Sequence, residues 1–353
     1  MQSKPSIKDI AKRANVSIGT VDRVLHNRGQ VSEATREKVQ KVIEELNYEP
    51  NIIARSLASK QDFNIGILLP RSSSKNDYWY YPAVGIQKAA AEHQYVGLNL
   101  VEAYYDLNLV ESFQDKISLL SEKDLDGVIT APIYKNELED YINQLENSNI
   151  KYSLLDSDLE DSQRSFFVGQ DPVQSGRVAA QLIDFTLQKD SPDILTLHFN
   201  PVTQGIPTIN LREDGFSEYF NHADTEVKVS SHLILYTSKE ELNSKLDQIF
   251  TDVQNLKAIF VPDSKSYLVA EYLENKTAKD VVLAGFDLLE ENATYLRKGV
   301  IDFIINQQPI TQGYQALNQL INSLIQKKEK IPSQNIPIDI ITSENIKYYD
   351  GLD

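Results

Sequence analysis

The sequence predicts a small all-α N-terminal unit followed by a larger α/β region with parallel sheets. Within residues 6–46, apolar side chains recur at helical spacing in three short segments. From residue 63 onward, short apolar runs alternate with amphipathic segments, which is typical of parallel sheets that helices cover on both faces. The chain has 353 residues, enough for two or more domains.

The alternation in the larger region assigns its elements in order. Strands are predicted at 65–69, 98–103, 127–130, 152–155, 194–197, 258–261, 281–286 and 301–305. Helices are predicted at 83–93, 109–121, 173–187, 240–250 and 310–326.

The composition excludes several kinds of protein chemistry. The chain has no cysteine, which excludes disulfides, iron–sulfur clusters held by thiolates and cysteine nucleophiles. No apolar run approaches the ~20 residues that a membrane-spanning helix needs, and residues 1–10 lack the apolar stretch of a secretory signal. We therefore expect a cytoplasmic protein.

The charges are distributed unevenly along the chain. The whole sequence holds 35 Lys and Arg against 51 Asp and Glu, a net charge of −16, yet residues 1–60 hold 11 basic against 7 acidic residues. A basic end can neutralise DNA phosphates, while an acidic remainder disfavours indiscriminate wrapping of DNA. Solubility accounts for most of the acidic excess.

Two short helices joined by a tight turn are predicted near the N-terminus. Ser6 can cap the first helix, and Asp9, three positions later, completes a capping box. Asn15 stands where the turn requires a left-handed residue, and Ser17 can cap the second helix. The apolar side chains predicted to face inward are Ile7, Ile10, Ala11, Ala14, Val21, Val24 and Leu25.

The second helix leaves a face that suits DNA reading. Ile18, Gly19, Asp22 and Arg23 lie away from its apolar side. A helix of this length fits the major groove, where base edges present a distinguishable pattern of donors and acceptors. Arg23 is therefore the predicted contact to a guanine.

A third helix, capped by Ser32 and running over about residues 33–46, completes this unit. Residues 6–61 as a whole closely resemble the N-terminal headpiece of the LacI/GalR family of bacterial transcription regulators. The chain departs from the family's common form at Asn15, which replaces a glycine, and at Asp22, where a small polar residue is frequent, so the operator sequence is left open. The residues predicted to contact DNA are Ser6, Ile7, Ser17, Ile18, Gly19, Thr20, Asp22, Arg23, Asn27, Arg55 and Leu57.

The segment after the headpiece, residues 51–58, is helix-prone but so short that it is marginal in isolation. The resemblance implies a hinge helix that orders when two copies pair over the minor groove, with Leu57 wedged into a base step and Arg55 nearby. The alternative is that Leu57 packs against its own domain. A ligand that separates the two hinges would melt them and release the DNA.

The larger region resembles the periplasmic-binding-protein-like sensor domain of the same family, most similar to the ribose-binding type. The resemblance implies two doubly wound lobes, with a ligand site outside the carboxyl ends of the strands. The expected domains are a headpiece at 1–49, a hinge helix and linker at 50–62, and a ligand-sensing domain at 63–353, with one lobe at about 63–168 and 307–335 and the other at about 169–306 and 336–353.

A run of aromatic residues follows the first predicted strand, and it is expected to form a loop. Asp77, Tyr78 and Trp79 match pocket positions of the family, and the aromatic faces can stack on a sugar ring. A dimer contact or the packing of a lid is the alternative. Asp156 matches an acidic ligand residue, but Ser157 replaces the arginine that usually follows it, which departs from a typical pentose site.

Four residues of the second lobe match further pocket positions. Arg212 carries a forked guanidinium that can hold two ligand hydroxyls or a carboxylate. Asp263, Asp287 and Gln307 each come at the end of a predicted strand, where side chains reach the cleft. The alternative for both aspartates is a role as a helix cap. Carboxylates, amides and aromatics together suit a neutral, polyhydroxylated ligand.

The favoured function is that of a homodimeric, ligand-responsive DNA-binding transcription regulator, a repressor of genes for carbohydrate uptake or catabolism. Two headpieces would read a pseudo-palindromic operator, and a sugar or sugar derivative bound between the lobes would change operator affinity. The alternatives are a transport-type sugar-binding protein and an activator with a non-sugar effector.

An enzyme is not expected from this sequence. It has no GxGxxG after a strand, no GxxxxGK[ST] and no GxSxG. Its five histidines show no metal-ligand spacing. We expect neither a cofactor nor a resident metal, and no association with a membrane.

Overall fold

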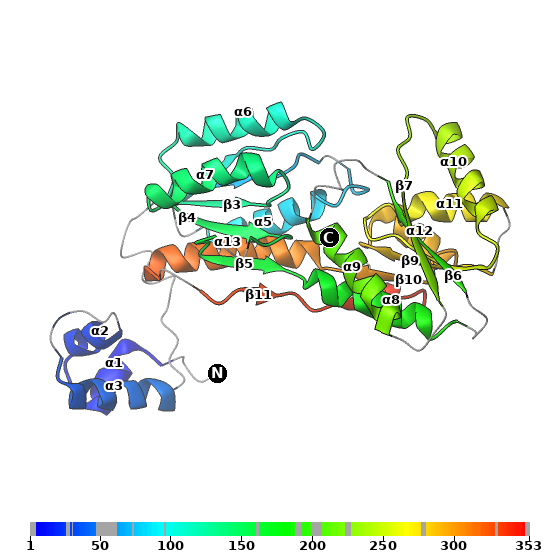
Figure 1. Ribbon diagram of the computed structural model, residues 1–353. Coiled ribbons are helices and arrows are strands. Elements are labelled where there is room, and N and C mark those ends of the chain that lie inside the picture. The colour runs from blue at the N-terminus through cyan, green and yellow to red at the C-terminus, as the bar shows by residue number, and fades with distance from the viewer. Residues whose placement is uncertain are drawn as a thin grey trace. The chain divides into compact units, whose positions relative to one another are not determined.

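The computed structural model of the chain in Figure 1 divides into two compact units, Met1–Ala58 and Ser59–Asp353. It describes residues 5–25, 29, 31–46, 62–72, 74–94, 97–159, 162–187, 192–199, 207–222, 227–276, 280–328 and 331–349. Among these residues no helix combines the length and the apolar character that crossing a bilayer requires.

The N-terminal unit holds three helices, α1 (Ile7–Ala14), α2 (Ile18–Leu25) and α3 (Glu33–Glu45). They enclose a small apolar core of Ile10, Ala11, Ala14, Val21, Val24, Val39 and Val42. The all-α headpiece that the sequence predicts is thus confirmed. A core this small gives limited stability, so well-capped helix ends matter. The turn between α1 and α2 forms as expected, with Asn15 in the left-handed region at φ 49°.

The predicted cap of α3 is wrong in one detail. Ser32 stands at the N-cap position with extended backbone, yet within the described residues its side chain caps no backbone N–H. Its hydroxyl instead hydrogen-bonds Thr35 Oγ1 at 2.8 Å. A threonine one turn away competes for the hydroxyl, so the residue type at a helix start does not by itself determine which partner the side chain takes.

The first lobe of the larger unit is a six-stranded sheet in the order β11-β5-β4-β3-β1-β2, with parallel pairing throughout. Helices α6 and α7 cover one face and α5 and α13 the other (Figure 1). The elements are β1 (Asp62–Leu68), α5 (Tyr80–Glu92), β2 (Gly97–Glu102), α6 (Val110–Ser121), β3 (Gly127–Thr130), α7 (Lys135–Asn147), β4 (Lys151–Leu155), β5 (Phe166–Gly169), α13 (Pro309–Gln326) and β11 (Gln334–Asn335).

The second lobe repeats this plan, with a sheet in the order β12-β10-β9-β8-β6-β7. Only β12 runs antiparallel among its described strands. The elements are α8 (Pro172–Asp184), β6 (Asp193–His198), α9 (Pro207–His222), β7 (Lys228–Leu233), α10 (Lys239–Asp252), β8 (Leu256–Phe260), α11 (Ser266–Lys276), β9 (Val282–Phe286), α12 (Glu290–Arg297), β10 (Phe303–Asn306), β12 (Asp339–Ile341) and the 3-10 helix η2 (Ile346–Tyr348). The two-lobed α/β architecture is confirmed.

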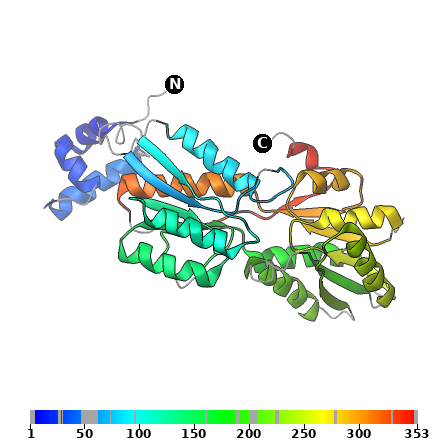
Figure 2. The same cartoon turned by 90° about the horizontal axis from the view of Figure 1, so that it is seen from above.

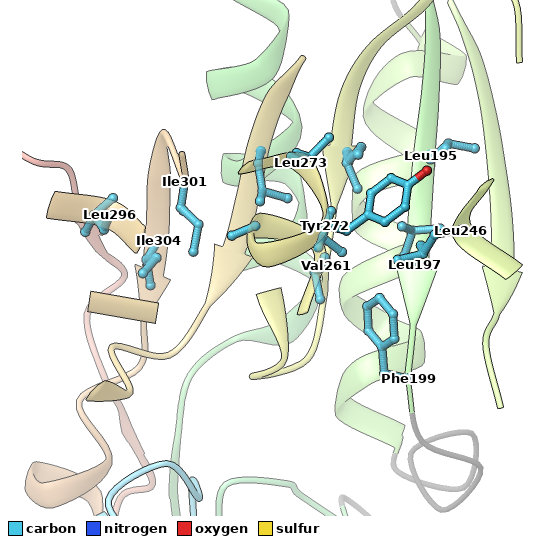
Figure 3. Close-up of a cluster of buried hydrophobic side chains, with 14 of the residues drawn as sticks. Leu195, Leu197, Phe199, Leu246, Val261, Tyr272, Leu273, Leu296, Ile301 and Ile304 are labelled. Carbon is cyan, nitrogen blue, oxygen red and sulfur yellow. The ribbon is translucent and has the colours of Figure 1, made fainter. Parts of the chain in front are cut away.

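Each face of the second sheet has its own apolar core. Figure 3 shows the core under α10, α11 and α12, where Leu195 and Leu197 of β6 lie near Leu246 at one end and Leu296 lies near Ile304 at the other. The opposite face packs against α8 and α9 and contains Phe216, Phe260 and Phe286, among others. Because β6, β8 and β9 are buried on both faces over most of their length, their sequences are mostly apolar, with Thr196 and Lys257 as polar exceptions within β6 and β8.

The chain passes between the two lobes three times, after β5, after β10 and after β11. Figure 2, seen from above, shows the lobes side by side with these crossings between them. Gln170 lies at the first crossing and is 2% exposed. Its Nε2 donates to the carbonyl oxygens of Asn306 and Pro337 at 3.3 and 3.1 Å, so one side chain ties the three crossings together.

Candidate functional site

A cavity of about 330 Å³ lies between the two lobes, at the carboxyl ends of strands from both sheets. Its walls include every residue that the sequence predicts to bind a ligand. These are Asp77, Tyr78, Trp79 and Asp156 from the first lobe, and Arg212, Asp263, Asp287 and Gln307 from the second. The fold brings these predicted residues to one place, and ligand binding by them stays a prediction.

The aromatic run is only partly the loop that the sequence predicts. Tyr80 and Tyr81 already belong to α5, which begins before Pro82 because the first turn of a helix tolerates proline. Tyr78 and Trp79 precede the helix and are 8% and 6% exposed, with ring centroids 5.1 Å apart in an edge-to-face pair. Most of each side chain is therefore packed against protein, and little of either ring is accessible.

Asp156 follows β4 with a left-handed φ of 69°, which turns its side chain toward the cavity. Tyr78 Oη donates to Asp156 Oδ1 at 2.8 Å, and Ser157 Oγ donates to Oδ2 at 3.1 Å. Burial raises the pKa of the carboxyl group, and the charge of Arg212 opposes that rise. Burial likewise raises the pKa of Tyr78, with Asp156 adding to it, so the phenol remains a donor.

Arg212 is the buried cation of the cavity, at 3% exposure. Its Nη1 donates to Pro262 O and its Nη2 to Gln307 Oε1, both at 2.9 Å, and Cζ lies 4.1 Å from the centroid of the Phe286 ring. Within the described part of the chain, its Nε is buried without a partner. A guanidinium held by a carbonyl, an amide and a ring keeps its remaining N–H groups aimed in fixed directions.

The backbone of Arg212 is positioned by a close approach of two helices. A Cβ built on Gly176 of α8 would lie 1.9 Å from the Arg212 carbonyl oxygen, and one built on Gly215 of α9 would lie 2.1 Å from Val173 O. Only glycine permits α8 and α9 to pack with their backbones in contact at these two points.

Asp287 and Asp263 complete the second wall. Asp287 follows β9 with φ 63° and accepts from Gln307 Nε2 at 2.9 Å, so a chain of bonds connects it to Arg212. Burial raises its pKa to about 7, because the charges of Asp156 and Asp263 reinforce the loss of solvation. The pKa of Asp263 is also raised by burial.

Asp263 also fits the helix-cap alternative in part. Its Oδ1 accepts from Lys265 N at 2.9 Å, just before α11, and its Oδ2 accepts from Phe199 N at 3.3 Å. The side chain therefore braces two loops and borders the cavity at the same time. The carboxyl group of Asp77 likewise braces its own loop while it borders the cavity, since its Oδ1 accepts from Trp79 N at 3.1 Å. Burial raises the pKa of this carboxyl group.

The cavity also contains residues that the sequence did not single out. Thr208 lies one helical turn before Arg212 on α9, and its hydroxyl hydrogen-bonds Ser157 of the other lobe. Its spacing from Arg212 was a signal that could have identified it. The other walls come from Arg71, Asn76, Asp106, Leu107, Asn108, Ile209, Ser264, Lys265 and Tyr267.

The surface predicted to read DNA is exposed along α2. Ile18 is 50% exposed, which is unusual for an isoleucine in so small a unit, and Ser17, Gly19 and Arg23 are exposed beside it. Ser17 Oγ accepts from Thr20 N at 3.1 Å, which confirms the predicted cap. The start of α2 therefore presents an apolar side chain between polar ones.

Other predicted DNA contacts have structural partners or lie outside the description. The capping box of α1 is present, since Asp9 Oδ2 accepts from Ser6 N at 2.8 Å and from its hydroxyl at 2.6 Å. Ile7, Thr20 and Asp22 are half-buried. The predicted contacts Asn27, Arg55 and Leu57 lie outside the described residues.

Two family descriptions match the chain. Residues 6–51 match "Bacterial regulatory proteins, lacI family", and residues 65–329 match "Periplasmic binding protein domain". The second match spans the two-lobed unit that contains the cavity, and the first covers the helices of the N-terminal unit.

Curated relatives are transcription regulators. The HTH-type transcriptional regulator RegA of Clostridium saccharobutylicum is 37% identical over 156 residues, which is 43% of this chain and 45% of that protein. The match thus spans less than half the length of this relative. The sucrose operon repressor of Lactococcus lactis subsp. lactis is 26% identical over 352 residues, covering 98% of this chain and 99% of the repressor.

A solved structure shares the larger part of the fold. A protein from Bacteroides fragilis, provisionally described as a LacI transcriptional regulator, superposes with a TM-score of 0.76 and 28% identity. It covers 82% of this chain and 100% of its own.

Proposed function

We propose a function from the premise that this chain belongs to the lacI family of bacterial regulatory proteins. The chain acts as a ligand-responsive transcription regulator. Its N-terminal unit reads an operator, and a sugar or sugar derivative bound between the two lobes switches operator affinity. The observation that carries this proposal is the cavity itself, where polar groups from both lobes converge in a chain that also has an exposed reading helix.

The chemistry of the cavity supports a hydroxylated ligand. Asp156, Asp263 and Asp287 are buried acceptors, Arg212 carries a buried guanidinium, Gln307 carries a buried amide, and Tyr78 and Trp79 add aromatic side chains to the lining. Such a surface can pair many hydroxyl groups in fixed geometry, and it discriminates strongly because each unpaired buried group would cost free energy. The name of the sucrose operon repressor agrees with a carbohydrate effector and with repression.

The switch follows from the two-lobed geometry. A ligand that bonds both walls stabilises the closed arrangement of the lobes over the open one by its difference in affinity for the two. In a homodimer, lobe closure changes the distance between the paired hinges, and the two headpieces then fit or miss the two half-sites of a pseudo-palindromic operator. We expect this to take place in the cytoplasm, with no catalytic step and no cofactor.

The experiment is a thermal-shift screen of the full chain, followed by DNA-binding titrations. The panel contains monosaccharides, sucrose, sugar phosphates, sugar acids and nucleosides. A ligand at ~100 times its dissociation constant adds about 2.7 kcal/mol to the native state, which a melting curve resolves easily. Operator affinity that changes with the stabilising ligand supports the proposal and decides between inducer and corepressor.

Other outcomes favour the alternatives. Ligand binding without any sequence-dependent DNA binding would favour a transport-type binding protein. Stabilisation by a nucleoside but by no sugar would favour a regulator with a non-sugar effector, and increased transcription from a target promoter would favour an activator.

The reading helix can be tested separately. Arg23→Ala should weaken operator binding by about 1–3 kcal/mol and relax the base preference at one position, because a guanidinium can pair with two acceptors of one guanine. Arg13→Ala is a suitable control, since Arg13 pairs with Glu45 at 3.3 Å on α3. Binding of both variants to a set of operators with single-base changes distinguishes a base contact from a general loss of charge. An unchanged base preference in Arg23→Ala would mean that Arg23 does not contact a base.

A further inference from the structure

Among the described residues, side-chain hydrogen bonds connect the two lobes across the cleft. Ser157 of the first lobe bonds Thr208 of α9, and Asn76 of the first lobe accepts from the backbone N–H of Glu291, at the start of α12. From the second bond we infer that Asn76 is a positioning residue, which caps α12 from the opposite lobe and thereby stabilises the closed cleft. In its effector-dependent part, this inference rests on the function proposed above.

Helix α12 lacks an ordinary cap of its own. Its N-cap residue is Leu289, which is 1% exposed and has no side-chain acceptor. The first N–H groups of any helix have no partner within the helix, and Ser, Thr, Asp or Asn usually accepts from one of them. Here Asn76 Oδ1 accepts from Glu291 N at 3.0 Å, although the two residues are 215 positions apart in the chain.

Hydrogen bonds within the loop hold the backbone at Asn76. Asn76 N donates to Ser74 Oγ at 3.1 Å, and Asp77 N donates to Ser74 O at 3.0 Å. The backbone that carries the acceptor is therefore held by its own loop, and closure needs little ordering of the backbone at this point.

An amide also suits the charges around this bond. The first turn of α12 already carries Glu290 and Glu291, and the cavity side of the loop carries Asp77. The oxygen of Asn76 accepts the N–H without adding another full negative charge there. The neutral amide therefore interacts favourably with the helix N-terminus. A carboxylate in its place would be repelled by the neighbouring acidic side chains.

The bond between Asn76 and Glu291 should affect the closure of the lobes and not the direct contacts with the ligand. Opening the cleft would break the Asn76–Glu291 hydrogen bond and expose the Glu291 N–H to water. The bond therefore stabilises only the closed arrangement. Loss of one neutral hydrogen bond should shift the balance toward the open form about fivefold. Effector release should accelerate by a similar factor while effector association changes little, because the bond forms after the ligand has entered.

The test measures the distance between the lobes in the full chain. The sequence has no cysteine, so Glu122→Cys and Asp252→Cys, exposed positions beside α6 and α10, take spin labels selectively. Labelled chain diluted into unlabelled chain reports distances within one protomer. Without ligand, Asn76→Ala should increase the population of long distances about fivefold.

Two further variants make this result specific. Asn76→Asp keeps the acceptor oxygen but adds a negative charge beside Glu290, Glu291 and Asp77, so it should restore only part of the short distances. Asn64→Ala is the matched control, because the Asn64 side chain bonds Asp124 O and Asn99 within the first lobe, so its loss should leave the distances unchanged.

The outcomes separate the inference from the proposed function. Unchanged distances in Asn76→Ala, or an equal change in Asn64→Ala, would overturn the role of Asn76. With the panel sugar that stabilises the wild type, faster release from Asn76→Ala at an unchanged association rate would extend the role to the effector. If no panel sugar stabilises the wild type, the sugar-sensing proposal loses its support, while the ligand-free distances still decide the role of Asn76.

Discussion

The two lobes are built alike but hold their cavity residues differently. In each lobe, two helices pack with backbones in contact at paired glycines, Gly85 and Gly313 in the first and Gly176 and Gly215 in the second. Each lobe also ends a central strand with a left-handed aspartate, Asp156 or Asp287. The difference lies in the partners, since hydroxyl groups hold Asp156, whereas Asp287 is held by an amide that also binds Arg212.

This difference in hydrogen-bond partners points to different roles for the two walls of the cavity. The second wall is a network in which hydrogen bonds connect a guanidinium, an amide and a carboxyl group. The first wall offers hydroxyls and an aromatic pair, and two of its residues, Asn76 and Ser157, bond the opposite lobe. We therefore propose that the second lobe orients the ligand and that the first lobe closes over it.

The largest expected effect comes from removing the guanidinium. Arg212→Ala should weaken ligand binding by about 100-fold or more, because hydrogen bonds to charged groups are worth about 1.5–3 kcal/mol each. It also leaves Pro262 O and Gln307 Oε1 without a donor, so the free energy of unfolding should fall by about 1–3 kcal/mol. Calorimetric titration and urea unfolding measure the two effects.

Arg212→Lys serves as the control for this change. It keeps the positive charge but loses the forked geometry, so it should restore part of the stability and little of the ligand affinity. If the lysine variant bound ligand like the wild type, charge alone and not the fork would matter in the second wall.

The paired glycines allow a direct comparison of the lobes. Gly176→Ala and Gly85→Ala would each place a Cβ at 1.9–2.0 Å from a carbonyl oxygen, and forcing the helices apart should lower stability by about 1–3 kcal/mol in both. Only Gly176 abuts Arg212, so only Gly176→Ala should also weaken ligand binding among the folded chains. Equal loss of affinity in both variants would contradict the orienting role of the second lobe.

A smaller effect should appear in the pH dependence of stability. Burial raises the pKa of Asp287 from 3.8 to about 7, so the folded chain keeps a proton that the unfolded chain releases. Its contribution to stability is fully present below pH ~4 and is lost as the pH rises toward 7. Asp287→Asn should therefore flatten the fall in stability between pH 4 and 7.

Asp156→Asn provides the comparison for this titration. The pKa of Asp156 is also raised by burial, and Arg212 opposes the rise at both carboxyl groups, but only at Asp287 do the charges of two neighbouring carboxylates, Asp156 and Asp263, add to it. Replacement of Asp156 should flatten the pH profile less than that of Asp287, and urea unfolding at several pH values would reveal the order. The reverse order would mean that the two carboxyl groups do not differ in their surroundings as described.

Local chemistry was predictable from the sequence. The capping box of Ser6 and Asp9 and the left-handed Asn15 depend on neighbours within a few positions, and both are present. The gathering of the predicted pocket residues also followed, since strand ends of parallel sheets meet at one edge. The start of α5 was placed too late, at residue 83, whereas the helix begins at Tyr80 and contains Pro82 in its first turn, where proline is tolerated.

Contacts between distant segments were not predictable. The bond from Glu291 to Asn76 and the pair of Ser157 and Thr208 depend on how one lobe lies against the other, and no spacing in the chain encodes that. The cap of α3 also differed, because the hydroxyls of Ser32 and Thr35 bond each other. Competition between two acceptable partners is decided by geometry that a sequence pattern does not contain.

The most direct test of the account is a titration of operator DNA with the full chain, with and without the sugar that stabilises it. The wild type should change its operator affinity on adding the sugar, and Arg212→Ala should bind the operator like the ligand-free wild type in both conditions. An operator affinity that stays the same when a sugar is bound in the cavity would contradict the account, because ligand binding and DNA binding would then be uncoupled.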